Sequence, residues 1–260
     1  MRFGCCAGLD RLTAVAKAGY DYIEPGLRGT VAPLEGLEKF EEARRLLAGA
    51  PITPEAFNLF VPGSLNLVGP EVEGEKVERY VTSACERVSA LGGRIIVFGS
   101  GGARRRPDDF PEEETRSQLE HFLRLAGDAA QQAGLQIAVE PLSQAETNTI
   151  NTVAEGLDLA LSLKHPGVHV LADLYHMAAE GESYDVLERT EGRLIHVHLA
   201  EPPDRTAPGA VGYDFRPFFA ALSEGGYRGR ISVECRWQDF ESELPRALEV
   251  LRSHWDDVAG

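Results

Sequence analysis

The chain has 260 residues, a hydrophobic content of 43% and a formal net charge of -15 at pH 7. This length is close to the ~250 residues of an eightfold β/α barrel, and the apolar fraction supports a sizeable core. The negative charge argues against nucleic acid as a partner, because binding a polyanion requires an excess of lysine and arginine.

No apolar run reaches the ~20 residues that a membrane-spanning helix needs, and the N-terminus lacks the apolar core of a signal peptide. The four cysteines show no CxxC spacing, and adjacent Cys5 and Cys6 would point to opposite faces of a strand. We therefore expect reduced thiols and a soluble cytoplasmic protein without a membrane partner.

Short apolar runs alternate with longer amphipathic runs along the whole chain. The apolar runs predict eight strands, at Phe3–Ala7, Tyr20–Glu24, Thr53–Phe60, Arg94–Gly99, Leu135–Glu140, Val168–Asp173, Leu194–Leu199 and Arg230–Glu234. The amphipathic runs predict eight helices, at Leu9–Ala18, Leu34–Leu47, Gly74–Leu91, Glu112–Ala133, Thr152–Leu163, Ser183–Thr190, Asp214–Glu224 and Glu241–Trp255. Eight such alternations favour an α/β fold with a closed parallel sheet, since closure leaves no edge strand. No linker or low-complexity segment interrupts the series, so we expect one (β/α)8 TIM-barrel domain over residues 1–260.

Four of the predicted strands end on a polar group that faces away from their apolar side chains. The fifth strand ends on Glu140, and the next three carry Asp173, His198 and Glu234 at the corresponding positions. Their separations of 33, 25 and 36 residues are close to the ~32 residues of one β/α unit in a chain of this length. The four groups should therefore lie on consecutive strands, at the end of the barrel where such enzymes place their catalytic groups.

Three carboxylates and an imidazole that meet at one barrel mouth would leave the carboxylates repelling one another without a cation. A ligand set of three oxygens and one nitrogen suits Mn²⁺, Co²⁺ or Mg²⁺ at least as well as Zn²⁺. Any one member alone could equally be an ion-pair partner or a satisfied polar group of the barrel interior. The register of all four favours a divalent metal site.

Further candidates lie near these strand ends. His176 is three residues beyond Asp173 and could reach a substrate, or it could cap a helix. Arg205 could hold a substrate oxygen or be a solvated loop residue, and Glu146 could support Glu140 or lie on the loop surface. Glu24 ends the second predicted strand as a wall residue or an ion-pair partner. We expect His196, one layer below His198, to be a buried and hydrogen-bonded barrel residue, with His121 and His254 on helix surfaces.

The run SGGARRRPDD at Ser100–Asp109 allows two interpretations. A glycine pair after a strand can bind phosphate through backbone N–H groups, and three arginines would add charge. However, the run is neither a Walker nor a dinucleotide fingerprint, and the acidic residues that follow it favour a solvated loop.

The segments VEPLSQAETN, ADLYHM, HVHLAEPPDR and YRGRISVEC, and more weakly FGSGGAR, carry a resemblance. The chain resembles the xylose isomerase-like TIM-barrel superfamily of the AP-endonuclease-2 type, in its sugar isomerase and epimerase branch. It is similar there to D-tagatose/D-psicose 3-epimerase and hydroxypyruvate isomerase. The resemblance implies one divalent metal held by Glu140, Asp173, His198 and Glu234, and it implies that Glu140 and Glu234 are also the acid/base pair. It places His176, Arg205 and Glu146 around the substrate.

The sequence departs from the pattern of these relatives in two places. Ser143 and Gln144 replace an Asn-Arg pair that often follows the first glutamate, and the loop before Arg205 is one residue longer than in the ketose 3-epimerases. Both departures affect substrate contacts rather than the four expected ligands. They therefore bear on the identity of the substrate more than on the chemistry.

These observations predict a metal-dependent isomerase of carbohydrate metabolism. It would move a proton of a small ketose or hydroxy-keto acid through a cis-enediolate. A metal-dependent dehydratase of an inosose or a dehydroshikimate-like acid remains the main alternative. A nuclease of the endonuclease IV type is disfavoured because the first four predicted strands contain no histidine, and a non-catalytic binding protein is disfavoured by the four candidate ligands. Homo-oligomerisation, the metal and the sugar are left open.

Overall fold

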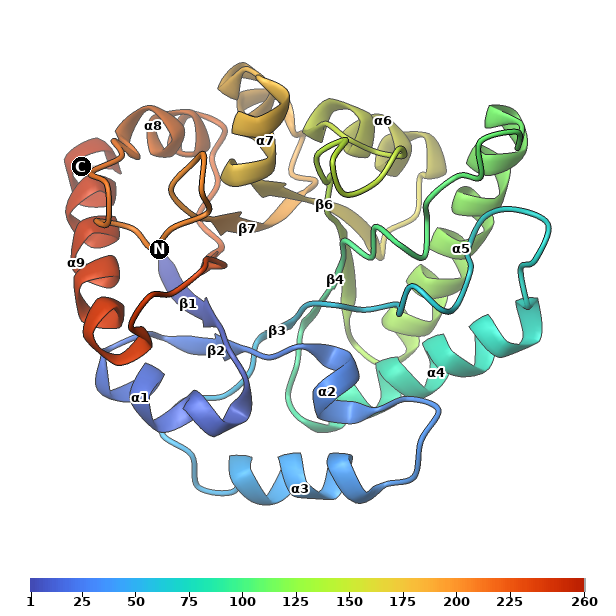
Figure 1. Cartoon of the computed structure of the whole chain (residues 1–260), viewed down its shortest axis with the longest axis horizontal. Helices are drawn as coiled ribbons and strands as arrows, with labels where there is room; N and C mark the ends of the chain where they lie inside the picture. Colours follow the sequence, from blue (N-terminus) through green and yellow to red (C-terminus); the bar gives the residue numbers. More distant parts are fainter. Residues whose placement is uncertain (260) are drawn as a thin grey trace.

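The computed structural model describes residues 1–259, in which eight parallel strands alternate with helices (Figure 1). The strands are β1 Arg2–Cys6, β2 Tyr22–Glu24, β3 Ala56–Phe57, β4 Ile95–Phe98, β5 Gln136–Val139, β6 Val168–Asp173, β7 Leu194–Leu199 and β8 Arg230–Val233. They pair in the order β2-β1-β8-β7-β6-β5-β4-β3. Isolated parallel bridges, Ile23 with Pro54 and Gly26 with Asn58, join β2 to the β3 region. The predicted barrel is confirmed as a single eight-stranded parallel sheet that is nearly closed.

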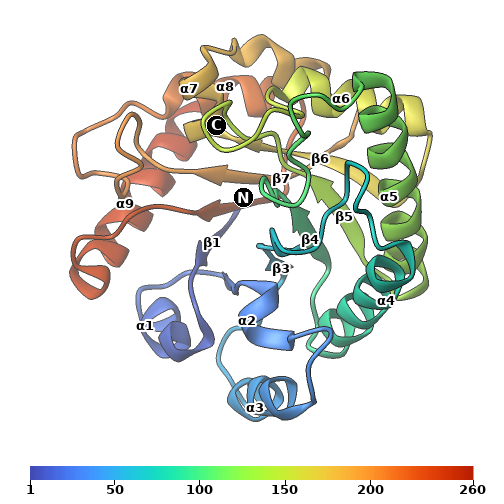
Figure 2. The same cartoon turned by 45° about the vertical axis from the view of Figure 1, so that its right-hand side comes forward.

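Helices surround the strands on the outside (Figures 1 and 2). They are α1 Leu12–Lys17, α2 Leu27–Val31, α3 Glu38–Leu47, α4 Gly74–Ala90, α5 Glu112–Gln132, α6 Val153–Leu163, α7 Leu174–Glu180, α8 Arg216–Glu224 and α9 Phe240–Ala259, with 3₁₀ helices η1 Leu9–Arg11 and η2 Tyr184–Arg189. Two of these, α2 and α7, lie where we expected no helix, and the predicted helix at Ser183–Thr190 is the 3₁₀ helix η2. Within residues 1–259, no helix combines the length and apolar character needed to cross a membrane.

The helix α7 begins directly at the end of β6. The Asp173 carboxylate accepts a hydrogen bond of 2.8 Å from the backbone N–H of Tyr175, which caps the first turn of the helix. The helix ends at Gly181, whose φ of 65° suits glycine. As a result, the side chains of the first turn of α7 lie beside the end of the strand.

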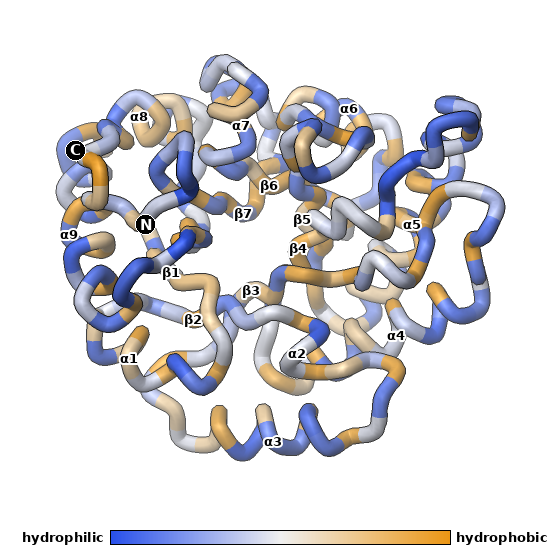
Figure 3. Tube along the Cα trace, in the orientation of Figure 1, coloured by the Kyte–Doolittle hydropathy of each residue, from blue (hydrophilic) through white to orange (hydrophobic). Residues whose placement is uncertain are grey.

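The barrel has an apolar layer inside it as well as the larger core between strands and helices. Five small or aliphatic side chains fill this inner layer: Ala56, Ile95, Val97, Ala138 and Leu171. Figure 3 shows the hydrophobic residues concentrated along β4, β6 and β7. Ala138 lies two residues before Glu140, and Leu171 lies two residues before Asp173. Since residues two apart on a strand point to the same side, the apolar layer lies directly below these polar groups inside the barrel.

The opposite end of the barrel is held by Glu55, just before β3. Its carboxylate accepts hydrogen bonds from Arg2 of β1 and from Arg230 at the start of β8. This ion-pair cluster joins strands from both halves of the barrel, and it is remote from the C-terminal strand ends.

Candidate active site at the C-terminal ends of the strands

The four predicted ligands meet at one end of the barrel. Glu140 directly follows β5, Asp173 ends β6, His198 lies near the end of β7, and Glu234 directly follows β8. One donor atom from each lies within 4.8 Å of the other three. The His198 Nδ1 atom is 3.0 Å from Glu140 Oε1 and 3.3 Å from Glu234 Oε2.

The donor set fits a divalent cation. Asp173 is 1% exposed, and its Oδ2 atom has no hydrogen-bond partner among residues 1–259. A buried carboxylate oxygen without a partner is costly unless a charge or a ligand compensates it. Three carboxylates and one imidazole are a common donor set for Mn²⁺, Co²⁺, Mg²⁺ or Zn²⁺.

The two glutamates of the cluster have different electrostatic environments. Burial raises the pKa of Glu140, with Glu234 and Asp173 adding repulsion, and this outweighs the hydrogen bond with His198. Burial also opposes the ionisation of Glu234, but the attraction of His198 and Arg205 lowers the pKa of Glu234 to about 2. Of these two carboxylates, Glu140 therefore takes up a proton more readily than Glu234 does.

The second nitrogen of His198 points away from the cluster. Its Nε2 atom lies 2.8 Å from Glu24 Oε1, and Glu24 Oε2 lies 2.7 Å from His196 Nε2. All three side chains are fully buried. Glu24 is thus an ion-pair partner, one of its two expected roles, and His196 is the buried, hydrogen-bonded residue that we expected.

His176 and Arg205 approach the cluster from the next elements along the chain. His176 of α7 accepts a 3.1 Å hydrogen bond from the Ser143 N–H at Nδ1, and its buried Nε2 has no hydrogen-bond partner in the described chain. Arg205 donates a 2.5 Å hydrogen bond to Glu234 Oε2, and its guanidinium lies 4.8 Å from the centre of the Tyr175 ring. The structure therefore brings both predicted substrate contacts to the site.

Glu146 also reaches the site. Its side chain is 45% exposed, and its Oε1 atom is 3.4 Å from Arg205 Nη1 and 3.9 Å from His176 Nε2. It lies beside these two residues rather than against Glu140, where we had considered placing it.

A cavity of about 220 Å³ opens above the cluster, with Glu140, Glu146, His176, Arg205 and Glu234 on its walls. Arg28 of α2 and Leu142 after β5 form part of the remaining walls. The loops after β3 and β4 supply the other wall residues: Asn58, Leu59, Val61, Gly63, Gly99, Ser100, Gly101 and Gly102.

Asn58 and Gly99 are wall residues that directly contact the cluster and that we did not predict as site residues. Asn58 donates a 3.0 Å hydrogen bond from Nδ2 to Glu234 Oε1. A side chain added at Gly99 would place its Cβ 2.2 Å from Glu140 Oε2. Asn58 lies within the predicted strand Thr53–Phe60 and Gly99 ends the predicted strand Arg94–Gly99, whereas the observed β3 and β4 end just before them. Their place near a C-terminal strand end was the signal that could have identified them.

We expected the loop at Ser100–Asp109 to be solvated, but part of it is buried. Arg104 is fully buried, donates a 2.8 Å hydrogen bond to the backbone oxygen of Glu140, and lies over the Phe98 ring at 5.5 Å. Arg105 donates to the backbone oxygen of Glu146 at 2.8 Å. These two arginines therefore fix the segment that follows β5.

The two helix histidines differ in their surroundings. His121 is exposed on α5, as expected. His254 is partly buried instead, because its Nδ1 accepts a 3.3 Å hydrogen bond from the Phe215 N–H at the start of α8.

A nearly closed parallel barrel with acidic and imidazole groups at the C-terminal strand ends defines the class of (β/α)8 enzymes. Within that class, the chain belongs to the family described as xylose isomerase-like TIM barrel, which matches residues 12–254.

Its relatives are sugar epimerases and isomerases. An L-ribulose 3-epimerase from Methylomonas sp. is 30% identical over 259 residues, covering 96% of this chain and 87% of that protein. A putative hydroxypyruvate isomerase from Streptomyces coelicolor is 24% identical over 241 residues, covering 87% of this chain and 84% of that protein. The solved structure of D-allulose 3-epimerase from Methylomonas sp. in complex with D-allulose superposes with a TM-score of 0.86 at 23% identity, over 98% of this chain and 97% of that chain. The predicted resemblance is confirmed, and the chain is an isomerase-type enzyme.

Proposed function

We propose that this chain is a divalent-metal-dependent sugar epimerase or isomerase that acts on a small ketose or hydroxy-keto acid. The observation that carries the proposal is the meeting of four donor atoms within 4.8 Å beneath a cavity of about 220 Å³. The relatives, an L-ribulose 3-epimerase and a putative hydroxypyruvate isomerase, support the same class of reaction.

Glu140, Asp173, His198 and Glu234 would hold the metal. Mn²⁺, Co²⁺ or Mg²⁺ fits this oxygen-rich set, and Zn²⁺ is also compatible with it. When bound, such a cation polarises a carbonyl and stabilises the charge of an enediolate by several kcal/mol. It also removes the repulsion among the three carboxylates.

Glu140 and Glu234 are the proposed acid/base pair. They follow β5 and β8, which are separated in the sheet by β6 and β7, so their carboxylates approach the cavity from different sides. Asn58 donates to one oxygen of Glu234 and Arg205 to the other, which fixes the plane of this carboxylate. One glutamate removes the proton next to the substrate carbonyl and the other returns it. Return to the opposite face of the same carbon inverts it, whereas return to the neighbouring carbon interconverts ketose and aldose.

His176, Arg205 and Glu146 are the proposed substrate contacts. Because the Nδ1 atom of His176 accepts the Ser143 N–H, its Nε2 carries a proton and can donate to a substrate oxygen. Arg205 is held by Glu234 and by the ring of Tyr175, so its guanidinium stays at the cavity wall when the site is empty. Glu146 offers a partly exposed carboxylate oxygen to a substrate hydroxyl.

The test is solvent proton exchange. Metal-loaded enzyme in D₂O is mixed in turn with free ketoses, hydroxypyruvate and inososes, and products are analysed by NMR and chromatography. We expect deuterium at a carbon next to the carbonyl, together with an epimer or isomer. Release of water from an inosose without an epimer would assign the chain to the dehydratase alternative.

The variant Glu234→Gln should lower turnover by about 10²–10⁴-fold, the usual contribution of a general acid or base. It should still bind the metal through the remaining ligands. Glu55→Gln, at the opposite end of the barrel, is the matched control and should keep its turnover. Near-normal deuterium exchange by Glu234→Gln would show that the assignment of the two glutamates is wrong.

A further inference from the structure

A buried hydrogen-bond network lies directly below the candidate metal site. It connects Glu24 of β2 with His196 and His198 of β7 and with Ser232 of β8. Their four side chains are 0% exposed. We propose that Glu24 is a positioning residue that fixes the tautomer and the ring orientation of His198, so that Nδ1 of His198 faces the metal. This inference rests on the proposed metal site.

The two nitrogens of His198 face different carboxylates. Nε2 lies 2.8 Å from Glu24 Oε1, whereas Nδ1 lies 3.0 Å from Glu140 Oε1 and 3.3 Å from Glu234 Oε2. A carboxylate only accepts hydrogen bonds, so without a metal each nitrogen can donate a proton to the carboxylate it faces. A cation at the cluster would displace the proton of Nδ1, whereas Glu24 keeps the proton on Nε2, so that the lone pair of Nδ1 serves the cation. Carboxylate partners of this kind orient metal-binding histidines in many proteins and raise the basicity of the ligand nitrogen.

The rest of the network keeps Glu24 in this role. His196 Nε2 at 2.7 Å and the Ser232 hydroxyl at 2.6 Å both engage Glu24 Oε2, which leaves Oε1 to His198. The Tyr22 hydroxyl lies 2.8 Å from Ser232 Oγ. Since Ser232 donates its only hydroxyl proton to Glu24, Tyr22 donates to Ser232. The ring of Tyr22 fits here because the neighbouring residue on β1 is Gly4, where a Cβ would lie 2.2 Å from that ring.

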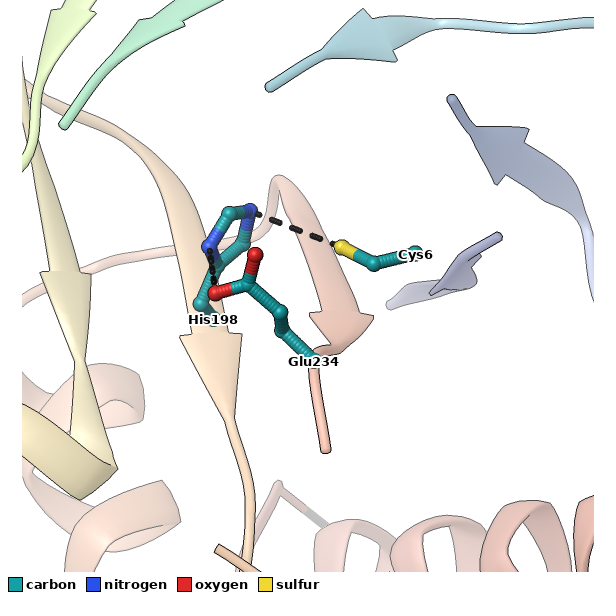
Figure 4. Close-up of side chains that lie close together, drawn as sticks. All are labelled: Cys6, His198 and Glu234. Atoms are coloured by element: carbon teal, nitrogen blue, oxygen red, sulfur yellow. Dashed lines mark hydrogen bonds and ion pairs between the residues drawn. The ribbon is translucent and has the colours of Figure 1, made fainter. Parts of the chain in front are cut away.

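Two other groupings of the same residues could be imagined as cation sites. Glu24, His196 and His198 form one, but their O···N separations of 2.7 and 2.8 Å are those of direct hydrogen bonds. Cys6, His198 and Glu234 form the other (Figure 4). Figure 4 shows that Cys6 approaches the ring nitrogen opposite the one near Glu234, and its sulfur is 4.0 Å from Nε2. That nitrogen already faces Glu24, so neither grouping competes with the Nδ1 site.

The experiment measures Mn²⁺ affinity and the tautomer of His198. Titration calorimetry of Glu24→Gln should give a dissociation constant about 10–100-fold weaker than that of the wild type, the usual effect of losing such a partner. ¹⁵N NMR of the wild type loaded with diamagnetic Mg²⁺ or Zn²⁺ should show His198 protonated at Nε2 and without a proton at Nδ1, and Glu24→Gln should change this spectrum. Ser232→Ala, which removes one hydrogen bond to Glu24, should weaken Mn²⁺ binding by roughly two- to fivefold. Glu55→Gln, a carboxylate with two arginine partners at the far end of the barrel, should leave the Mn²⁺ affinity unchanged.

The possible results separate this inference from the proposed function. A wild type that binds none of Mn²⁺, Co²⁺, Mg²⁺ and Zn²⁺ would overturn the proposed function. A wild type that binds Mn²⁺, with Glu24→Gln binding it equally well, would overturn the role of Glu24 alone. If Glu24→Gln fails to fold, the NMR spectrum of the metal-loaded wild type and the Mn²⁺ affinity of Ser232→Ala still test the role of Glu24. A metal-loaded His198 protonated at Nδ1, or unchanged affinity in Ser232→Ala, would contradict the inference.

Discussion

At the scale of single residues, the candidate site depends on how one imidazole is shared between carboxylates. His198 contacts Glu140 and Glu234 through one nitrogen and Glu24 through the other. Burial by itself disfavours a charged imidazole, but the negative charges of Glu24 and Glu234, together with Cys6, raise the pKa of His198 well above its usual value. His198 therefore holds its extra proton to a higher pH than an isolated imidazole does.

Metal binding should consequently release protons. The pKa of Glu140 and that of His198 are both raised without metal, so both groups hold their protons to a higher pH than usual. A cation requires the deprotonated forms, so affinity should rise with pH, by about tenfold per pH unit for each proton released. Titration calorimetry in two buffers of different ionisation enthalpy would count these protons. Affinity independent of pH between 5 and 8 would contradict this account.

His176 should act on the substrate and not on the metal. Its Nε2 is buried, unpartnered among residues 1–259, and at the cavity. His176→Ala should therefore raise KM or lower kcat/KM by about tenfold or more, because a lost hydrogen bond to a buried group costs about 1–3 kcal/mol. Mn²⁺ affinity, measured in parallel, should stay within about threefold of the wild type. Normal kinetics with weakened metal binding would reverse the assignment.

At the scale of elements, the sequence predicted β6 and β7 at their observed bounds, because each is a short, mostly apolar run that begins just after a glycine, Gly167 or Gly192. The third strand was predicted over Thr53–Phe60 but covers only Ala56–Phe57. Pro54 cannot donate to the ladder, and Leu59 has a left-handed backbone with φ of 53°. The helix α7 was missed because seven residues show too few turns for a periodic pattern.

The loop after β4 offers a test of how elements position the cluster. Gly99→Ala would place a Cβ 2.2 Å from Glu140 Oε2, so that carboxylate must move. We expect a loss of at least tenfold in kcat/KM with little change in the melting temperature, since misplacement by ~1 Å can cost 10²-fold. Gly74→Ala on α4 is the matched control, because nothing lies within 4 Å of its added Cβ. Equal activity of the two variants would show that Glu140 has room to shift.

At the scale of the whole molecule, the C-terminal strand ends bring together residues that are distant in the chain. The sequence predicted that Glu140, Asp173, His198 and Glu234 converge, because all four end consecutive strands. It did not predict the contact of Glu24 with His198, which are 174 positions apart. That contact depends on how nearly the barrel closes and on which rotamers fill its interior. The burial of Arg104 was missed for the same reason.

Because the proposed ligands come from four strands of one barrel, metal binding should stabilise the entire fold. At a free metal concentration 100 times the dissociation constant, binding adds about 2.7 kcal/mol to the free energy of unfolding. For a chain of this size, that corresponds to a rise of roughly 5–10 °C in Tm. Differential scanning calorimetry of the protein, after EDTA treatment and again after addition of Mn²⁺, measures this rise in Tm. In the control variant Glu55→Gln, both Tm values should be lower, but the difference between them should be the same as in the wild type. An identical Tm of the wild type with and without Mn²⁺ would contradict a metal site shared by the four strands.

The most direct test is anomalous diffraction from a crystal soaked with Mn²⁺ and a ketose. The account predicts one strong peak about 2.0–2.3 Å from His198 Nδ1 and from one oxygen each of Glu140, Asp173 and Glu234. The sugar should lie with its carbonyl next to that peak and a carbon-bound proton between the two glutamates. A crystal without a peak there, or with the cation held by a different set of side chains, would contradict the account.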